Sequence, residues 1–383
     1  MRRRGSRTAP TRRSRVATRS SRSGSPTGRA TRGTTEAPRP DGPHEQGRRA
    51  MTIVVETSGS SGKPKRVIIS DEAVQASTEA AIERLGGPGQ WVLALPEQYI
   101  AGKNVIWRNA VSGAPLVRTE GAFTAEAFVE AVQSLEHERK YTSLVPTQLA
   151  RLVDAAALDR SFIGPIARLD RILLGGQRAP FGLIERAARL GWRVTRTYGA
   201  TETVGGCVWD GRPLRDVKLR LTDQIEIAGP QLADGYDDPA LTEQRFVVDG
   251  SGTRWYKTGD AGSLISGLLQ VSGRIDDVIN SGGIKVSLAA VEHVVQTFAP
   301  DAVVVAAPHP EWGEVPAVVT TLKPSLAEIR AAVGNALGKP ARPNHLVTVS
   351  VMPTTASGKP DRKRLTRLVA SRTQERRRRG LFG

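Results

Sequence analysis

Small, hydroxyl-bearing and cationic residues gather in one short run that could bind a polyphosphate. Its two glycines let the backbone turn N–H groups toward an anion, while hydroxyl groups add donors and two lysines add charge. The run is not a Walker A loop, because only two residues separate its glycines and Pro64 follows the first lysine. On its own, such a loop is more often a linker. Its candidate ligands are Thr57, Ser58, Gly59, Ser60, Ser61, Gly62, Lys63 and Lys65.

Two later segments carry groups that suit a nucleotide. Residues 198–202 offer an aromatic ring, the hydroxyl of Thr201 and the carboxylate of Glu202, which suits Mg²⁺. They follow a predicted strand, and open α/β sheets place their ligands at the carboxyl ends of strands. Residues 256–260 end on a carboxylate that could accept hydrogen bonds from two ribose hydroxyls. Taken singly, each segment could equally be an ordinary turn.

Two more segments lie toward the C-terminus. Residues 273–277 place Arg274, a bidentate donor, beside paired acids, and a flexible Ser-Gly-Gly run follows. Residues 353–362 expose Lys359 on a glycine-containing loop. A lone surface lysine is usually only solvated, so neither segment decides a function alone.

All five segments occur in this order, and together they resemble the adenylate-forming superfamily of acyl-CoA synthetases, peptide-synthetase adenylation domains and luciferases. The resemblance covers about residues 52–365. It implies a two-step reaction. A carboxylate attacks the α-phosphate of ATP, giving an acyl-adenylate and pyrophosphate, and a thiol then displaces AMP. The resemblance therefore implies ATP, Mg²⁺ and, as the thiol, coenzyme A.

The resemblance also implies a role for each motif. The run 57–65 would hold the β- and γ-phosphates, Thr201 would contact the α-phosphate, and Glu202 would bind Mg²⁺. A small rotating domain would deliver Lys359 to the carboxylate and α-phosphate oxygens, where charge develops. The other implied contacts are Tyr198 stacked on adenine with the neighbouring Gly199, the backbone of Gly175, Gly176 and Gln177 at its edge, Asp260 and Arg274 at the ribose, and Asp276 as the hinge.

Three further stretches look like the o-succinylbenzoate–CoA ligases of menaquinone biosynthesis, in their compact form. They are residues 100–108, 142–149 and 205–211. The chain carries no carrier-protein domain after the lysine loop, so free CoA is the expected thiol. The family resemblance therefore predicts conversion of o-succinylbenzoate to o-succinylbenzoyl-CoA. A ligase for another aryl or short acid is the alternative within the same class.

The substrate of that family is a dicarboxylate, so the carboxylate that is not activated needs a cation. Arg108 matches the family's substrate-binding arginine, although it could instead form a salt bridge on a helix surface. Ser143 matches a substrate-contacting serine, and Gly206 belongs to the implied pocket. Tyr99 stands where the family commonly has a histidine, which puts any role of that histidine in doubt. Cys207 is expected to line the pocket passively, as a small buried hydrophobe.

The elements that would position these groups alternate between strands and helices. Strands separated by helices of about 10–15 residues indicate βαβ units and a mostly parallel sheet with helices on both faces. The first strand, residues 52–56, is predicted to be short and buried. The other predicted strands are 91–95, 142–145, 171–174 and 192–195, and the predicted helices are 71–85, 124–135, 147–153 and 181–190.

The pattern changes after Tyr198. Residues 217–272 form short segments between turns, which is typical of antiparallel β structure. Helices at 288–297 and 326–337 with strands at 302–306 and 346–351 then predict a small α+β unit. We expect an α/β protein: a large N-terminal domain with mostly parallel sheets and a short antiparallel β part, plus a small mobile α+β C-terminal domain. The expected divisions are a disordered extension 1–50, an AMP-binding domain 51–275, a catalytic-lysine domain 276–365 and a basic tail 366–383.

The net charge of the 383 residues, +17, is confined to the two ends of the chain. Residues 1–50 carry +11 and residues 361–383 carry +7, while the part between them carries −1. The first segment reads as a disordered extension, or as translated sequence upstream of a start near Met51. A nucleic-acid-binding protein acting through basic tails is the alternative from another class, but the neutral body does not favour it.

The remaining composition narrows the setting of the protein. One cysteine excludes an internal disulfide framework and fits a reducing compartment. No stretch approaches the roughly 20 apolar residues that a membrane span needs, and the Arg-rich N-terminus has no apolar core of a secretory signal. We therefore expect a cytoplasmic enzyme whose partners are a small carboxylate, ATP and CoA. The oligomeric state stays open, a homodimer included.

Overall fold

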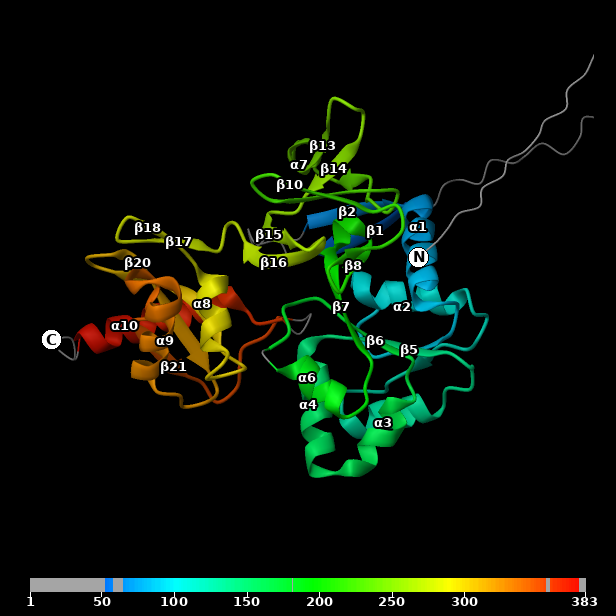
Figure 1. Ribbon diagram of the computed structural model, residues 1–383, viewed down its shortest axis with the longest axis horizontal. Coiled ribbons are helices and arrows are strands. Elements are labelled where there is room, and N and C mark those ends of the chain that lie inside the picture. The colour runs from blue at the N-terminus through cyan, green and yellow to red at the C-terminus, as the bar shows by residue number, and fades with distance from the viewer. Residues whose placement is uncertain (1–51, 58–64, 181, 356–358, 379–383) are drawn as a thin grey trace, which may run out of the picture. The chain divides into compact units, whose positions relative to one another are not determined.

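The computed structural model describes residues 52–57, 65–180, 182–355 and 359–378 (Figure 1). All of them lie in one compact unit, Ala50–Gly383. The extension 1–50 lies outside the described residues, so its expected disorder stays a prediction.

A seven-stranded sheet forms the centre of the larger part, in the order β4-β3-β5-β6-β7-β8-β9. Its pairs from β4 to β7 are parallel, which confirms the predicted mostly parallel sheet. The strands β8 and β9, which the sequence pattern did not predict, add an antiparallel end. The strands are β3 (Gln90–Leu93), β4 (Val117–Arg118), β5 (Lys140–Leu144), β6 (Arg171–Leu174), β7 (Val194–Ala200), β8 (Gly205–Trp209) and β9 (Arg212–Pro213).

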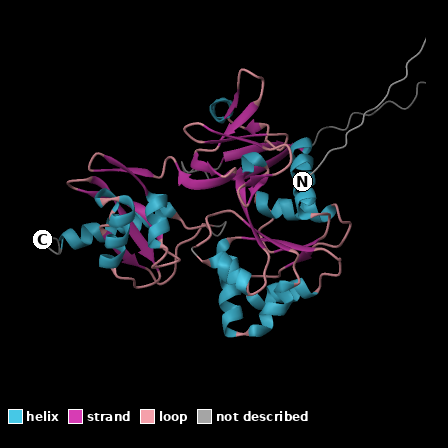
Figure 2. Cartoon of the chain, viewed as in Figure 1, coloured by secondary structure: helices cyan, strands magenta, loops and turns pink. Residues whose placement is uncertain are grey.

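Helices cover both faces of this sheet, as predicted. Successive strand residues point to opposite faces, so Trp91 and Leu93 pack in one apolar core with α1 and α2, while Val92 packs in a second core with α3 to α6. In Figures 1 and 2, α3, α4 and α6 lie on the opposite side of β5 and β6 from α2. The helices are α1 (Asp71–Leu85), α2 (Ile100–Ala110), α3 (Ala125–Gln133), α4 (Pro146–Leu158), α5 (Ile163–Ala167) and α6 (Leu183–Arg189), with the 3-10 turn η1 (Arg160–Phe162).

The first strand differs from its prediction. Only Val55 of β1 is buried, and the prediction of a buried strand is wrong. The reason is position: β1 (Thr52–Thr57) is the edge of a three-stranded antiparallel sheet with β2 (Lys65–Ser70) and β12 (Gly235–Tyr236), and it pairs with β2 alone. An edge strand shows solvent a face that a central strand buries.

The expected antiparallel β segment is present after β9. A four-stranded sheet runs in the order β10-β11-β14-β13, and a separate hairpin joins β15 to β16. This hairpin ends at Arg274, so it carries the predicted ribose ligands at its open end. The elements are β10 (Lys218–Leu221), β11 (Ile225–Ala228), α7 (Pro239–Arg245), β13 (Phe246–Val248), β14 (Arg254–Lys257), β15 (Asp260–Ile265) and β16 (Leu268–Arg274).

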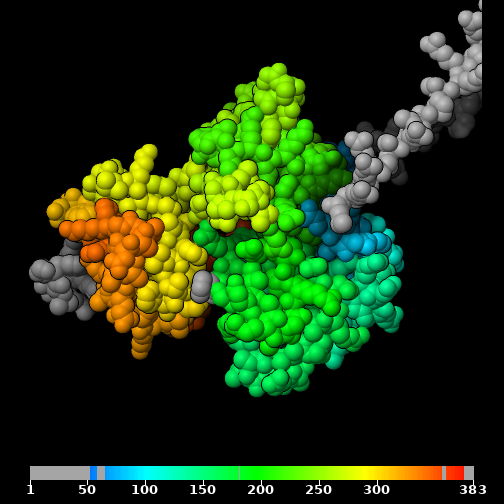
Figure 3. Space-filling model, in the orientation of Figure 1, coloured from blue at the N-terminus to red at the C-terminus, as the bar shows by residue number. Residues whose placement is uncertain are grey.

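The remaining elements build a small α+β unit with its own two apolar clusters. Figure 3 shows these segments, coloured from yellow to orange, gathered in one body. Its sheet runs β18-β17-β20-β19, and β21 pairs with β20 in parallel. The elements are β17 (Val278–Ser281), β18 (Ile284–Ser287), α8 (Leu288–Val295), β19 (Val303–His309), β20 (Gly313–Thr320), α9 (Leu326–Leu337), η3 (Lys339–Ala341), β21 (His345–Thr348) and α10 (Arg362–Arg378).

Most of the expected basic tail, residues 366–383, belongs to the helix α10 (Arg362–Arg378). The boundary at 365 falls inside α10, whose Leu365 and Val369 are fully buried against the sheet of the small unit. Arg362 fixes the start of this helix by donating two hydrogen bonds to the buried carboxylate of Glu292, at 2.7 and 3.0 Å. Apolar residues four positions apart lie on one face of a helix and can pack it against a sheet. The many arginines around them made the segment look like a solvated tail.

Within the described ranges, none of the helices combines the length and the apolar character that crossing a bilayer requires.

Candidate active site

The carboxyl ends of the parallel strands β5, β6 and β7 bring three predicted segments to one edge of the central sheet. Ser143 lies near the end of β5, residues 175–177 follow β6, and Tyr198 lies near the end of β7. Parallel strands end at the same edge, where open α/β sheets bind their ligands. The topology therefore gathers residues that are separated by more than fifty positions in the chain.

Two predicted glycines are required by close approach to one side chain. A Cβ on Gly175 would stand 2.5 Å from Thr197 Oγ1, and a Cβ on Gly206 would stand 2.7 Å from Thr197 Cβ. Gly199 pairs with Gly206 across β7 and β8. These glycines let the strands and the loop after β6 pack against each other without side chains between them.

The expected phosphate loop lies between two paired strand ends. Thr57 and Lys65 are partners in the β1–β2 register, and Thr57 Oγ1 donates to the Lys65 carbonyl at 3.4 Å. Residues 58–64, which include Ser58, Gly59, Ser60, Ser61, Gly62 and Lys63, lie outside the described residues. The ammonium of Lys65 lies 5.9 Å from the ring centroid of Tyr236. The ends of the loop are thus fixed beside the residue that contacts Glu202.

Glu202 is buried in the turn η2 (Thr201–Thr203), and its carboxylate is held from one side. The hydroxyl of Tyr236 donates to Glu202 Oε1 at 2.6 Å. Burial, followed by the charge of Glu202, raises the pKa of Tyr236, so the phenol stays protonated as a donor. The other carboxylate oxygen makes no hydrogen bond with the residues that the structure describes.

This arrangement fits a magnesium ion shared with a nucleotide. Mg²⁺ is typically bound by one or two carboxylates together with substrate phosphates and water. Glu202 supplies one such carboxylate, with an oxygen that no described residue hydrogen-bonds, and no cluster of three acidic, histidine or cysteine side chains occurs in the described ranges. A cage made by the protein alone is therefore not present there.

The predicted adenine and ribose residues form a continuous chain of hydrogen bonds. The Tyr198 hydroxyl donates to Asp260 Oδ2 at 2.7 Å, and Arg274 Nη1 donates to Asp260 Oδ1 at 3.4 Å. Burial raises the pKa of Asp260, against the lowering by its Tyr198 and Arg274 partners. Both carboxylate oxygens are thereby oriented, although each oxygen can still accept a further hydroxyl group.

Arg274 also holds the predicted hinge residue. Its guanidinium donates to both carboxylate oxygens of Asp276, at 2.9 and 3.2 Å, and to the Thr258 carbonyl. The hydrogen bond from Arg274 lowers the pKa of Asp276. One guanidinium therefore joins the end of the β15–β16 hairpin to the segment that leads into the small unit.

Lys359 lies at the end of a short hairpin turn, where Thr355 N donates to the Lys359 carbonyl at 2.7 Å. Its Cε is 3.9 Å from the position of a Cβ on Gly176, so the side chain reaches the loop after β6. The residue as a whole is exposed, yet desolvation of its ammonium lowers the pKa of Lys359, and the charge of Glu202 partly opposes that effect. The structure thus brings Lys359 and Glu202, two expected catalytic residues, into electrostatic contact.

Arg108 is buried without an acidic partner. It lies on the inner face of α2 with 4% of its surface exposed, and its Nε has no hydrogen-bond partner. Its guanidinium carbon lies 5.9 Å from the ring centroids of both Trp91 and Trp209. Burial lowers the pKa of Arg108 to about 10. The alternative of a surface salt bridge is wrong, because among the described residues no carboxylate pairs with this cation.

The other expected pocket residues are placed at different depths. Ser143 is buried in β5, and Tyr99 is half-buried just before α2, where it is the helix N-cap. Cys207 is buried in β8, and burial raises the pKa of its thiol to about 12. A thiol with that pKa is not a nucleophile at neutral pH, which agrees with a passive role.

Several residues at this site were not predicted. Tyr236, Trp91 and Thr197 each touch a predicted residue, and Asn104 touches Val204 in the turn that follows two of them. Asn104 and Trp209 lie inside two of the family-like stretches, so their presence carried a signal. For Tyr236, Trp91 and Thr197, no spacing in the sequence points to the contact.

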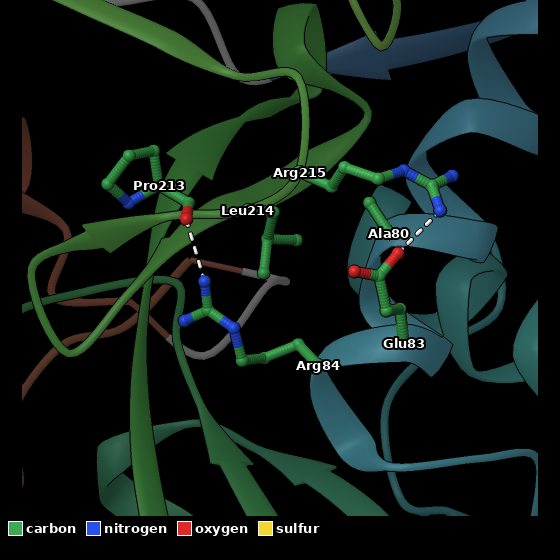
Figure 4. Close-up of a pocket in the computed structure, with 6 residues that line it drawn as sticks. All are labelled: Ala80, Glu83, Arg84, Pro213, Leu214 and Arg215. Atoms are coloured by element: carbon green, nitrogen blue, oxygen red, sulfur yellow. Dashed lines mark hydrogen bonds and ion pairs between the residues drawn. The ribbon is translucent and has the colours of Figure 1, made fainter. Parts of the chain in front are cut away.

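A separate surface recess of about 390 Å³ lies between α1 and the segment after β9 (Figure 4). Its charged groups are already paired: Arg84 donates to the Pro213 carbonyl, and Arg215 forms an ion pair with Glu83. None of the predicted site residues lines it. With its cations satisfied, this recess offers no free group to a ligand.

Comparison with known proteins shows the family of the chain. The family model described as AMP-binding enzyme matches residues 7–236, and the model of the AMP-binding enzyme C-terminal domain matches residues 291–359. The chain belongs to the AMP-binding enzyme family. AMP-binding enzymes of this kind are ATP-dependent and adenylate-forming, so the residues at the strand ends belong to an acid-activating ligase.

Named relatives of this AMP-binding enzyme cover most of its length. A probable 2-succinylbenzoate–CoA ligase of Mycobacterium tuberculosis is 38% identical over 339 residues, which cover 85% of this chain and 86% of that protein. The 2-succinylbenzoate–CoA ligase of Listeria monocytogenes serotype 4b is 30% identical over 333 residues, or 82% of this chain and 69% of that protein.

Solved structures show the same fold. The o-succinylbenzoate CoA synthetase (MenE) of Bacillus subtilis, in complex with the acyl-adenylate intermediate OSB-AMP, has a TM-score of 0.69 at 27% identity, covering 82% of this chain and 68% of that one. The amide bond synthetase McbA of Marinactinospora thermotolerans has a TM-score of 0.71 at 26% identity, covering 83% and 68%.

Proposed function

We propose that this AMP-binding enzyme converts o-succinylbenzoate to o-succinylbenzoyl-CoA through an acyl-adenylate, as a step of menaquinone biosynthesis. A carboxylate oxygen of the acid attacks the α-phosphorus of ATP, and the bond to the bridging oxygen breaks to release pyrophosphate. The thiol sulfur of CoA then attacks the acyl carbon, and the bond to AMP breaks. The named relatives support this assignment. One is a probable 2-succinylbenzoate–CoA ligase and one a 2-succinylbenzoate–CoA ligase, and this chain matches most of the length of each.

The buried guanidinium of Arg108, which pairs with no carboxylate among the described residues, is the observation that carries the choice of acid. A cation removed from water without a carboxylate partner costs stability, so its retention favours a function in binding an anion. A dicarboxylic acid supplies that anion through the carboxylate that is not activated. The two tryptophan rings near Arg108 suit an aryl group next to that carboxylate.

The adenylation step is assigned to groups that converge at the strand ends. Lys359 would stabilise the charge that builds on the α-phosphate and the attacking carboxylate, and Thr201 would donate to the same phosphate. Tyr198 would stack on adenine, and Asp260 with Arg274 would accept and orient the ribose. Mg²⁺ bound at Glu202 would supply charge neutralisation of the phosphates.

Three organisational points belong to the same proposal. The division near residues 275–276, between β16 and β17, would be the hinge about which the small unit turns, with Asp276 at its centre. ATP and CoA are held in the cytoplasm, which is where we place the reaction. The oligomeric state stays open, a homodimer included, and light scattering of the purified chain measures it.

Pyrophosphate release across a panel of carboxylic acids tests the function. The panel should hold o-succinylbenzoate, its two monocarboxylate analogues, benzoate and short aliphatic acids, each with ATP, Mg²⁺ and CoA. We expect o-succinylbenzoate to give the highest kcat/KM. AMP and the thioester should be formed in equal amounts. Preference for a monocarboxylate would replace this assignment with the alternative, a ligase for another aryl or short acid.

A further inference from the structure

The turn that presents Thr201 and Glu202 ends on a strained residue. Val204 has φ of 50°, a left-handed conformation that β-branched residues rarely adopt, and its side chain is fully buried. It follows the expected catalytic residues directly, at the end of η2. A residue in this conformation stays there only when its surroundings fix it.

Two side chains fix the carbonyl of Val204 from two different helices. Asn104 Nδ2 on α2 donates to Val204 O at 2.9 Å, and Ser77 Oγ on α1 donates to the same oxygen at 3.2 Å. Both donors are buried, with 3% and 4% of their surface exposed. Because Val204 lies between η2 and β8, bonds to its carbonyl hold the end of η2 in place.

Asn104 is fitted closely to this turn. Its Nδ2 also donates to the Ile100 carbonyl at 3.0 Å, which fixes the amide on its own helix. A Cβ on Gly205, the residue after Val204, would lie 2.5 Å from Asn104 Nδ2, so only a glycine fits at this position. The amide therefore reaches the turn through direct contact.

The same helix carries the cation of the acid pocket. Asn104 and Arg108 are one turn apart on α2, so they lie on one face. Asn104 Oδ1 and Arg108 Nε are both buried and have no partner in the described part of the chain. One rigid helix thus contacts the turn that bears Glu202 and holds the guanidinium expected to bind the acid.

We propose that Asn104 is a positioning residue for adenylate formation, with Ser77 as its weaker partner. By holding the Val204 carbonyl, Asn104 keeps Thr201 and Glu202 at fixed distances from the acid pocket on α2. This inference rests on the proposed function. It assigns Asn104 no contact with substrate, so its loss should impair the use of ATP and Mg²⁺ and leave thiol transfer largely intact.

Asn104→Ala, Ser77→Ala and Gln90→Ala, compared with the unchanged chain, test the proposal. Gln90 is the matched control: its amide is equally buried and hydrogen-bonded to backbone, but at the amino end of β3, away from the site. Four quantities are measured: the rate of adenylate formation, the rate of thiol transfer from pre-formed acyl-adenylate, the Mg²⁺ concentration for half-maximal rate, and Tm.

For Asn104→Ala we expect adenylate formation to fall about tenfold and thiol transfer to stay within about twofold, because the buried Val204 carbonyl then keeps only the longer bond from Ser77 and the turn is held less firmly. The Mg²⁺ requirement should rise. Ser77→Ala should lower the rate of adenylate formation and raise the Mg²⁺ requirement by smaller amounts. Gln90→Ala should lower Tm and leave that rate and the Mg²⁺ requirement unchanged. Equal effects of Asn104→Ala and Gln90→Ala would overturn the proposal.

Should Asn104→Ala fail to fold, Ser77→Ala decides, and an unchanged Mg²⁺ requirement in that variant would overturn the proposal. The proposed function fails in a different way, because the unchanged chain would then release no pyrophosphate with o-succinylbenzoate. If the unchanged chain is active and Asn104→Ala forms the adenylate at the same rate, only the inference about Asn104 is refuted.

Discussion

The hydroxyl of Tyr236 donates to Glu202 Oε1 at 2.6 Å, although 34 positions separate the two residues. Tyr236 lies in the short strand β12, which pairs with β2, the strand that follows the phosphate loop. The expected metal ligand is therefore oriented by the same small sheet that carries the loop. Substitutions in either strand should be felt at the carboxylate.

Tyr236→Phe should reduce kcat/KM for Mg-ATP by about tenfold, since a hydrogen bond to a charged group is worth about 1.5–3 kcal/mol. The ring and its packing against Phe246 remain, so the fold should persist. Steady-state kinetics at varied Mg-ATP measure the effect. Tyr141→Phe is the control, because it removes a hydroxyl that donates to the Leu85 and Gly87 carbonyls away from the site. Matching losses in both variants would refute a specific role for Tyr236.

Lys359→Ala should cripple adenylate formation and largely spare thiol transfer from pre-formed acyl-adenylate. The ammonium stabilises charge that develops only in the first step. Pyrophosphate exchange and thioester formation, assayed separately, measure the two half-reactions. Lys363→Ala, which removes an exposed lysine at the start of α10, should change neither rate. Equal loss of both half-reactions in Lys359→Ala would contradict the assignment.

As the pH rises, the rate of adenylate formation should begin to fall at a lower pH than it would if the pKa of Lys359 were that of an ordinary lysine. Desolvation lowers the pKa of Lys359 from the ordinary value of about 10.4, so the ammonium loses its proton earlier as the pH rises. Glu202 opposes that shift, and Glu202→Gln should therefore move the alkaline limb to still lower pH. Profiles of kcat/KM against pH for both proteins measure the two limbs. A limb that stays unchanged in Glu202→Gln would show that the two charges do not interact.

Arg108→Leu should separate activity from stability. Loss of the cation should cost about 2–5 kcal/mol of transition-state binding with o-succinylbenzoate, which is seen in kcat/KM. Replacing a buried unpaired charge with an apolar side chain should raise Tm or leave it unchanged. Activity with a monocarboxylic acid gives the control within the same variant. An unchanged kcat/KM for the dicarboxylate would remove Arg108 from the acid site.

Deleting residues 366–383 should destabilise the small unit, because it removes the buried Val369 with most of α10 and uncovers part of the apolar cluster. Arg362→Leu should act in the same direction, since it leaves the Glu292 carboxylate buried without its cation, at a cost of about 3 kcal/mol. Thermal unfolding measures both. A chain that ends at Arg378 is the control and should unfold like the full chain. An unchanged unfolding temperature after deletion of 366–383 would show that these residues do not contribute to the stability of the small unit.

The parallel part of the sheet could be predicted because its strands are short apolar runs between helices of regular period. The helix α1 has the predicted bounds, Asp71–Leu85. The helix α2 and the strand β8 were not predicted, since glycine and asparagine interrupt the pattern of α2 and two glycines begin β8. In each case the unusual residue serves a contact across the fold, and local propensity contains no information about such contacts.

The motif residues at the nucleotide site could be predicted because their order along the chain resembles a known family. Their partners could not. The contact of Tyr236 with Glu202 and the two rings around Arg108 depend on the packing of distant strands. The depth of Arg108 was equally hidden, because an arginine on a helix is usually solvated and paired.

The two indole rings beside Arg108 give the site an optical readout. The chain has six tryptophans, and two of them, Trp91 and Trp209, stand 5.9 Å from one guanidinium carbon. A carboxylate that pairs with this cation changes the electric field at both indoles, so their emission should shift when the acid arrives. Binding of the acid could then be followed by stopped-flow fluorescence before any bond to phosphorus forms.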